Sequence, residues 1–331
     1  MTRKLIGVLI ALCVAIPLLL LMFTGPASRA NPHDLPVGVA GPGAAQAAAA
    51  LQEREPGAFE VHTYATPAEL QQAARDREVY GGVATGAEPQ TVIATGASPV
   101  AAQMLTQIGT QASQGRAQVV DVAPASADDP RGAGFGSMVM PVFLTGVVLA
   151  LAATFLGRRA SVVALALPVG ALAVGAAAIA TTSAIGVLPG GFVAQWLALS
   201  AGILAIAAAV AGFVALVGLP GVGIGAALFL IVGMPLSGIA MPPEFLPHIW
   251  GTLGQWLPLG ATGSALRSAA FFGGTAGAGG AFLALGAWIV AGYCLLAIGA
   301  ARHHGSATDH ELEGGETTES REKSLPQPAT M

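Results

Sequence analysis

The fold is decided by the stretch SMVMPVFLTGVVLALAATFLGRRASVVALALPVGALAVGAAAIATT, residues 137–182. It contains two apolar runs, 137–157 and 161–182, separated by its only formal charges, Arg158 and Arg159. A helix needs about 20 apolar residues to cross the hydrocarbon core of a bilayer, so each run predicts a membrane span. Short cytoplasmic loops are enriched in basic residues, so the arginine pair predicts a turn on the cytoplasmic side.

The same criteria applied to the whole chain predict six spans in a one-plus-five layout. The spans are 5–23, 137–157, 161–182, 195–217, 221–240 and 281–301. Arg3 and Lys4 precede the first span and Arg302 follows the last, which predicts that both termini are cytoplasmic. We therefore expect an α-helical polytopic protein of the cell membrane, embedded in the lipid bilayer. A cleaved signal peptide ending near Ser28 or Ala30 is the alternative for residues 1–30, although the apolar run favours an uncleaved anchor.

Composition supports a membrane protein and excludes several other classes. The chain is 54% hydrophobic and only 10% charged, against about 25% charged residues in soluble domains. Its 45 glycines suit helices that pack closely in lipid. No segment has the basic surface of a nucleic-acid-binding protein. Both cysteines, Cys13 and Cys294, lie in predicted spans, which excludes a disulfide framework for the segment between the first two spans.

Residues 31–130 are polar and predict an extracytoplasmic α/β domain inserted between spans 1 and 2. They carry eleven acidic and four basic residues. Alternating apolar patterns predict strands at 35–41, 59–65, 80–85, 91–97 and 118–124, and helices at 44–52, 66–76 and 99–113. Thr66 and Ser98, each followed by proline, predict two of the helix starts. The order is βαβαββαβ, a sheet of five strands covered by helices.

Four regions follow from these patterns. Residues 1–30 form an N-terminal anchor, 31–130 the α/β domain and 131–301 the five-span domain. The fourth region is the tail 302–331. Residues 125–137, rich in Gly and Asp, cross the boundary between the second and third regions and are expected to be a flexible linker. The polar tail 302–331 is expected to be disordered and cytoplasmic.

Few residues predict chemistry. There is no nucleotide-binding P-loop, and the spans have no charge at mid-depth, which weakens the case for an ion-coupled carrier. Gly221 and Gly225 predict a close helix-packing face rather than a phosphate loop. A metal site at His303, His304 and His310 is disfavoured in so polar a tail. We expect no enzyme activity, no cofactor and no metal.

The most specific segment is MPPEFLPHIWGTLGQWLPLGATGSALRSAAFF, residues 241–272. It is too polar at its ends for a span, and its tryptophans favour a re-entrant or interfacial hairpin at the outer surface. Glu244 and Arg267 are its only formal charges and are candidates for an ion pair. Two interpretations stay open: a cap that merely seals the bundle, or a functional hairpin. The candidate functional residues are Met241, Pro242, Glu244, Pro247, Trp250, Trp256, Pro258 and Arg267.

This hairpin resembles the extracytoplasmic hairpin before the last span of the ABC type-2 (exporter) permease superfamily. The shared order is Met241-Pro242, Leu246-Pro247, Leu257-Pro258 and then Ala265-Leu266-Arg267. The one-plus-five layout also resembles the phage-infection-protein-like (YhgE/Pip) membrane proteins of that superfamily.

Two motifs of the α/β domain carry the second resemblance, and one departs from it. Leu35 to Val39 and Tyr80 to Val83 match the relatives' first and later strands, whereas Ala40 to Gly43 stand where they often carry Asn-x-Asp. The resemblance implies a homodimer of permease subunits that depends on a separate ATPase.

Two functions follow as expectations. The first is a permease-like transmembrane subunit of an export system, with a hydrophobic or amphipathic substrate because Ala, Gly, Val and Leu would line its path. Only four residues precede the first span, which would leave an ATPase little to bind. The second is therefore a non-transporting envelope protein whose outer domain binds a partner or envelope component.

Overall fold

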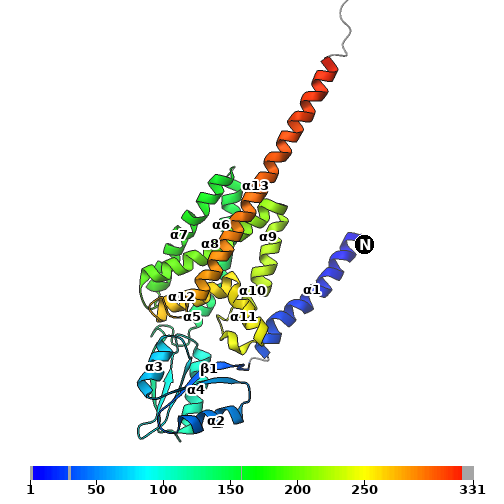
Figure 1. Cartoon of the computed structure of the whole chain (residues 1–331). Helices are drawn as coiled ribbons and strands as arrows, with labels where there is room; N and C mark the ends of the chain where they lie inside the picture. Colours follow the sequence, from blue (N-terminus) through cyan, green and yellow to red (C-terminus); the bar gives the residue numbers. More distant parts are fainter. Residues whose placement is uncertain (1–2, 29–30, 158, 323–331) are drawn as a thin grey trace, which may run out of the picture.

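The computed structural model describes residues 3–28, 31–157 and 159–322. They form a bundle of apolar helices with a separate, small α/β domain at one end (Figure 1). Four helical segments are long and apolar enough to cross a membrane: Ala133–Leu156, Ala160–Ala184, Phe192–Val217 and Gly279–Arg302. The chain is therefore a mostly helical, membrane-embedded protein. Four of the six predicted spans are thus confirmed as apolar helices of sufficient length, within a few residues of their expected bounds.

The other two predicted spans are helical but are not among these four. Helix α1 (Arg3–Ser28) covers the first, and it contacts only the bundle segments η1 and α10 closely (Figure 1). The fifth, expected at 221–240, is the shorter apolar helix Pro220–Leu236. It consists of α9 (Pro220–Gly225), the π-helical η1 (Ala226–Val232) and α10 (Gly233–Leu236).

The α/β domain has the predicted element order. Its elements are β1 (Leu35–Ala40), α2 (Ala44–Arg54), β2 (Phe59–Tyr64), α3 (Pro67–Arg75), β3 (Gly81–Ala84), β4 (Gln90–Ile93), α4 (Pro99–Ala112) and β5 (Gln118–Asp121). The sheet order is β2-β1-β3-β4-β5, in which β3 and β4 are antiparallel and the other neighbours are parallel. Helices α2 and α4 cover one face and α3 the other.

The two predicted helix caps are confirmed. The backbone N–H of Glu69 donates to Oγ1 of Thr66 at 3.2 Å, and that of Ala101 donates to Oγ of Ser98 at 3.2 Å. The Glu69 carboxylate also accepts from the N–H of Ala65 at 3.0 Å. The bonds to Thr66 and Ser98 satisfy N–H groups that the first helical turn leaves without intrahelical partners.

Helix α8 (Phe192–Val217) is the central helix of the bundle. In its most apolar stretch of 18 residues, 61% of the residues are buried, against 28–33% in the other three candidate spans. It packs against α6 (Val139–Leu156), α7 (Ala160–Ala184), α9, α12 (Pro258–Phe271) and α13 (Gly279–Glu322). The short α5 (Ala133–Ser137) leads into α6.

Glycines permit these close helix contacts. A Cβ on Gly292 of α13 would overlap the backbone of Ala208 on α8, and one on Gly221 would overlap the backbone of Phe213. A Cβ on Gly225 would lie 2.8 Å from the Val210 side chain. The predicted packing face of Gly221 and Gly225 is therefore confirmed.

The linker is more ordered than expected. The Asp129 carboxylate accepts from the N–H groups of Ala133 and Gly134 at 2.9 and 2.8 Å, and so caps α5. The Ser126 hydroxyl donates to the carbonyl of Gly186 between α7 and α8. The prediction of a flexible linker was wrong here, because Asp129 caps a helical turn within the segment and Ser126 binds a backbone carbonyl of the bundle.

The described part of the tail is helical, and the expected disorder of residues 302–331 stays a prediction. Helix α13 continues past Arg302 to Glu322 and projects from the bundle (Figure 1). The span supplies a formed helix, and adding residues to an existing helix is easier than nucleating one. Residues 323–331 and the side chains of His303, His304 and His310 lie outside the described residues.

Candidate functional site

The segment 241–272 forms a hairpin of two helices between the bundle and the α/β domain (Figure 1). It begins with the 3₁₀ turn η2 (Pro243–Phe245) and continues as α11 (His248–Trp256) and α12. The predicted helical hairpin is thus present. Its two helices differ: α12 is almost wholly buried, whereas α11 is largely exposed.

The exposed face of α11 is apolar. Ile249, Trp250, Leu253 and Trp256 are 72%, 45%, 48% and 51% exposed. Their spacing puts them along one side of the helix. Two of them are tryptophans, which favour the membrane–water interface.

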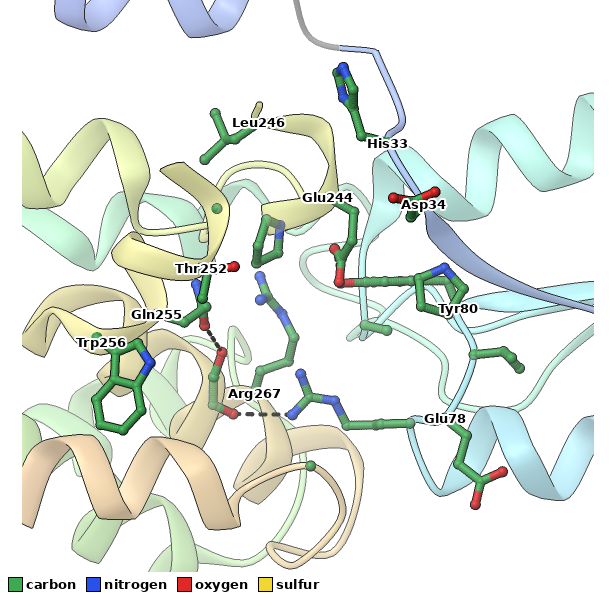
Figure 2. A pocket seen from close by; sticks show the side chains of 18 residues that line it. His33, Asp34, Glu78, Tyr80, Glu244, Leu246, Thr252, Gln255, Trp256 and Arg267 are labelled. Atoms are coloured by element: carbon green, nitrogen blue, oxygen red, sulfur yellow. Dashed lines mark hydrogen bonds between the residues drawn. The ribbon is translucent and has the colours of Figure 1, made fainter. Parts of the chain in front are cut away.

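A cavity of about 480 Å³ lies where the hairpin meets the α/β domain. Figure 2 shows its lining side chains, which come from the start of β1, the α3–β3 connection, η2, α11 and α12. Three candidate residues line it: Glu244, Trp256 and Arg267. The other five candidates do not.

Those five residues shape the hairpin or anchor it. Met241 packs against the apolar core of the α/β domain. The carbonyl of Pro242 accepts from Phe245 at 3.0 Å, that of Pro247 accepts from Trp250 at 2.8 Å, and Pro258 opens α12. Trp250 lies on the exposed face of α11.

Glu244 connects the hairpin to the α/β domain through side chain and backbone. Its Oε2 accepts a hydrogen bond from the Tyr80 hydroxyl at 2.9 Å, and its carbonyl accepts from the N–H of His33 at 2.8 Å. Burial raises the pKa of Glu244, although the bond from Tyr80 and the charges of Arg77 and Arg267 oppose the shift. Burial, followed by the charge of Glu244, raises the pKa of Tyr80.

Arg267 holds the loop before the hairpin. Its Nη2 donates to the carbonyl of Ile239 at 2.9 Å and its Nη1 to that of Gly238 at 3.5 Å. The guanidinium also lies over the ring of Phe135, 4.7 Å from the centroid. Arg267 and Glu244 do not form the predicted ion pair, because each side chain is turned to other partners. Burial lowers the pKa of Arg267 to about 10, so it remains a cation at neutral pH.

Arg77 extends from the α/β domain to the hairpin. Its Nη1 donates to the carbonyls of Ser264 and Ala276 at 3.3 and 3.5 Å, and its guanidinium lies 5.4 Å from the ring centroid of Phe272. Burial lowers its pKa. Arg77 has a φ of 61° just after α3, a left-handed conformation that is uncommon outside glycine. Sequence reasoning missed Arg77, because nothing in its local pattern distinguishes it from a solvated helix-end arginine.

Gln255 and Ser264 complete the polar wall between the two helices of the hairpin. Gln255 Nε2 donates to the carbonyl of Ser237 at 2.9 Å, and the Ser264 hydroxyl donates to Oε1 of Gln255 at 2.5 Å (Figure 2). Both side chains line the cavity. Within the described residues, no group of three His, Cys, Asp or Glu side chains is placed to hold a metal ion.

The fold and this junction define the class of protein: a membrane-embedded helical bundle whose α/β domain is bonded to a helical hairpin at one end. No protein-family model, curated protein or solved structure matches the chain.

Proposed function

We propose that the protein is a permease-like transmembrane subunit of an export system in the cell membrane. The proposal rests mainly on the hairpin 241–272. Its helix α12 is buried in the bundle, and its residues Glu244 and Ser264 are hydrogen-bonded to the α/β domain. Such a hairpin connects a domain outside the membrane to the packing of the spans. It suits a subunit that passes a conformational change between the two.

The helix directions support a six-span topology. The turn after α7, the hairpin and the start of α13 lie at the α/β end of the bundle, and the turns after α6 and α8 lie at the other end (Figure 1). Helix α1 has 26 residues, or about 39 Å, enough to cross. In our proposal the segment Pro220–Leu236 is the fifth span, and both termini are cytoplasmic.

By the same proposal the subunit is a homodimer that depends on a separate ATPase. Its substrate is hydrophobic or amphipathic, because the spans are lined by small and aliphatic side chains. Affinity purification in a mild detergent should recover a nucleotide-binding subunit with the tagged protein. Recovery of none, together with unchanged export in a deletion strain, would contradict the proposal.

A second candidate function rests on a different observation, the cavity at the junction. Its lining mixes polar and apolar side chains and lies outside the four candidate spans. That position favours a non-transporting envelope protein that binds a partner or envelope component. The purification separates the two: this function predicts no nucleotide-binding subunit.

A further inference from the structure

The junction cavity contains two guanidinium groups that form no ion pair with a carboxylate in the described part of the chain. Arg77 belongs to the α/β domain and Arg267 to α12, and both line the cavity. The only ion pair in the part of the chain that the structure describes joins His62 to Glu60, away from this cavity. Burying a charge costs free energy unless the charge is paired. Two half-satisfied cations at one cavity therefore favour an anionic occupant.

The hydrogen bonds of Arg77 and Arg267 do not use all the N–H donors of the two guanidinium groups. Arg77 uses only Nη1, which donates to the two carbonyls of Ser264 and Ala276. Arg267 uses its two terminal nitrogens for the carbonyls of Gly238 and Ile239. Carbonyl oxygens and the rings of nearby phenylalanines stabilise the two cations but do not neutralise them. A guanidinium has five N–H donors, so donors remain for a ligand.

The acidic residues at the cavity leave these donors available. Glu244 accepts its hydrogen bond from Tyr80. Asp34 and Glu78 are exposed, and Glu78 points away from Arg267 in Figure 2. The deeper part of the cavity therefore holds two cations and one carboxylate, Glu244, which interacts with both cations through its charge but offsets only one of the two positive charges.

The geometry favours a phosphate group. Two guanidinium groups that arrive from different elements can contact several oxygens of one tetrahedral oxyanion, and planar guanidinium forks match phosphate well. The cavity volume of about 480 Å³ falls within the usual range for small-molecule sites. One wall is α11, whose exposed apolar side chains Ile249, Trp250 and Leu253 lie outside the cavity lining. Those side chains would place the cavity at the depth of lipid head groups.

We propose that this cavity binds a phosphate-bearing ligand, held by Arg77 and Arg267, with the phosphate either free or carried by a lipid. Binding does not require transport, so the proposal goes beyond the proposed function. The test is calorimetric titration of the purified full chain in a neutral detergent. One arm uses inorganic phosphate and the other a short-chain phosphatidylglycerol below its micelle concentration. Octyl glucoside serves as an uncharged amphiphile for comparison.

Three variants make the titration specific. Arg77→Gln removes one guanidinium, and Thr252→Phe narrows the cavity while keeping both arginines. Arg75→Gln is the matched control, because Arg75 is exposed on α3 outside the cavity lining. Charge-assisted hydrogen bonds contribute about 1.5–3 kcal/mol, so R77Q should weaken binding about 10- to 100-fold. R75Q should leave it unchanged, and T252F should weaken it even if R77Q fails to fold.

The two arms identify the source of the phosphate. Saturable binding of inorganic phosphate supports a soluble ligand, and binding of phosphatidylglycerol alone supports a lipid. Either result supports the proposal only if T252F or R77Q weakens it. The proposal is overturned if neither probe binds, if octyl glucoside binds equally well, or if folded T252F and R77Q bind like the unmodified chain.

Discussion

The hydroxyl of Tyr80 donates a 2.9 Å hydrogen bond to the carboxylate of Glu244, 164 positions further along the chain. Tyr80 directly precedes β3 in the α/β domain, and Glu244 lies in η2 at the start of the hairpin. The bond therefore connects the α/β domain to the hairpin, two regions that lie far apart in the sequence. Removing the bond should weaken the attachment of the hairpin to the α/β domain.

Tyr80→Phe tests this connection. It leaves the buried Glu244 carboxylate without its side-chain donor, and an unsatisfied buried polar group costs about 1–3 kcal/mol. Thermal unfolding in detergent should show a lowered melting temperature. Tyr64→Phe is the control, because the Tyr64 hydroxyl makes no such bond across the junction. An equal change in both variants would contradict the role assigned to Tyr80.

Glu244→Gln should change how stability depends on pH. The pKa of Glu244 is raised above its ordinary value of 4.5, so the folded state holds this proton more tightly than the unfolded state. The contribution of the group is most favourable below pH 4.5 and is lost as pH rises through the folded pKa. The amide of E244Q still accepts from Tyr80 but does not titrate. Its melting temperature relative to the unmodified chain should therefore rise from acidic to neutral pH, and a constant difference would contradict this.

Arg267→Met should destabilise the hairpin. It removes hydrogen bonds to two carbonyls and the contact with the Phe135 ring. Charge-assisted bonds and cation–π contacts together predict a loss of about 2–4 kcal/mol. Arg75→Met, on an exposed position, should change little. Denaturant or thermal unfolding compares the two, and equal stability would show that Arg267 does not hold the 238–239 loop.

Gly292→Ala tests the close crossing of α13 and α8. Its new Cβ would overlap the backbone of Ala208, which cannot rotate away as a side chain can. Overpacking of this kind costs about 1–3 kcal/mol. Gly286→Ala is the control in the same helix, because nothing lies within 4 Å of a Cβ there. It should be neutral, or more stable by up to about 1 kcal/mol from helix propensity. Size-exclusion profiles in detergent and melting curves distinguish the two variants.

Cysteine labelling tests the proposed orientation. In a Cys13→Ala, Cys294→Ala background, single cysteines are placed at the exposed positions Glu88 and Arg159. A membrane-impermeant maleimide should label Glu88→Cys in intact cells, and Arg159→Cys only after permeabilisation. The opposite pattern would reverse the orientation inferred from the basic residues.

Local sequence was sufficient for most of the elements. The period-2 apolar patterns, the Thr66-Pro67 and Ser98-Pro99 starts and the helix-length apolar runs all report on neighbouring residues. They predicted the βαβαββαβ order, the hairpin and six spans, of which four are confirmed. The linker was misjudged because its composition suggests flexibility, whereas Asp129 caps the short helix α5 within the same segment and Ser126 binds Gly186, which is close only in the fold.

The site could be predicted only in part, for the same reason. Glu244, Trp256 and Arg267 were selected from the hairpin motif, but their partners Tyr80 and Arg77 lie in the other domain. The expected Glu244–Arg267 ion pair did not form, because Tyr80 and the 238–239 carbonyls bind these side chains instead.

The sequence by itself determined a membrane-embedded chain with a polar α/β insertion, because hydropathy and periodicity are properties of contiguous residues. Only the tertiary structure decided that α8 is central, that α12 is buried while α11 is exposed, and that two arginines from separate regions share one cavity. Those outcomes depend on which surfaces fit together. A contact between groups nearly 200 positions apart, such as Arg77 and the carbonyl of Ala276, leaves no periodic signal in the chain.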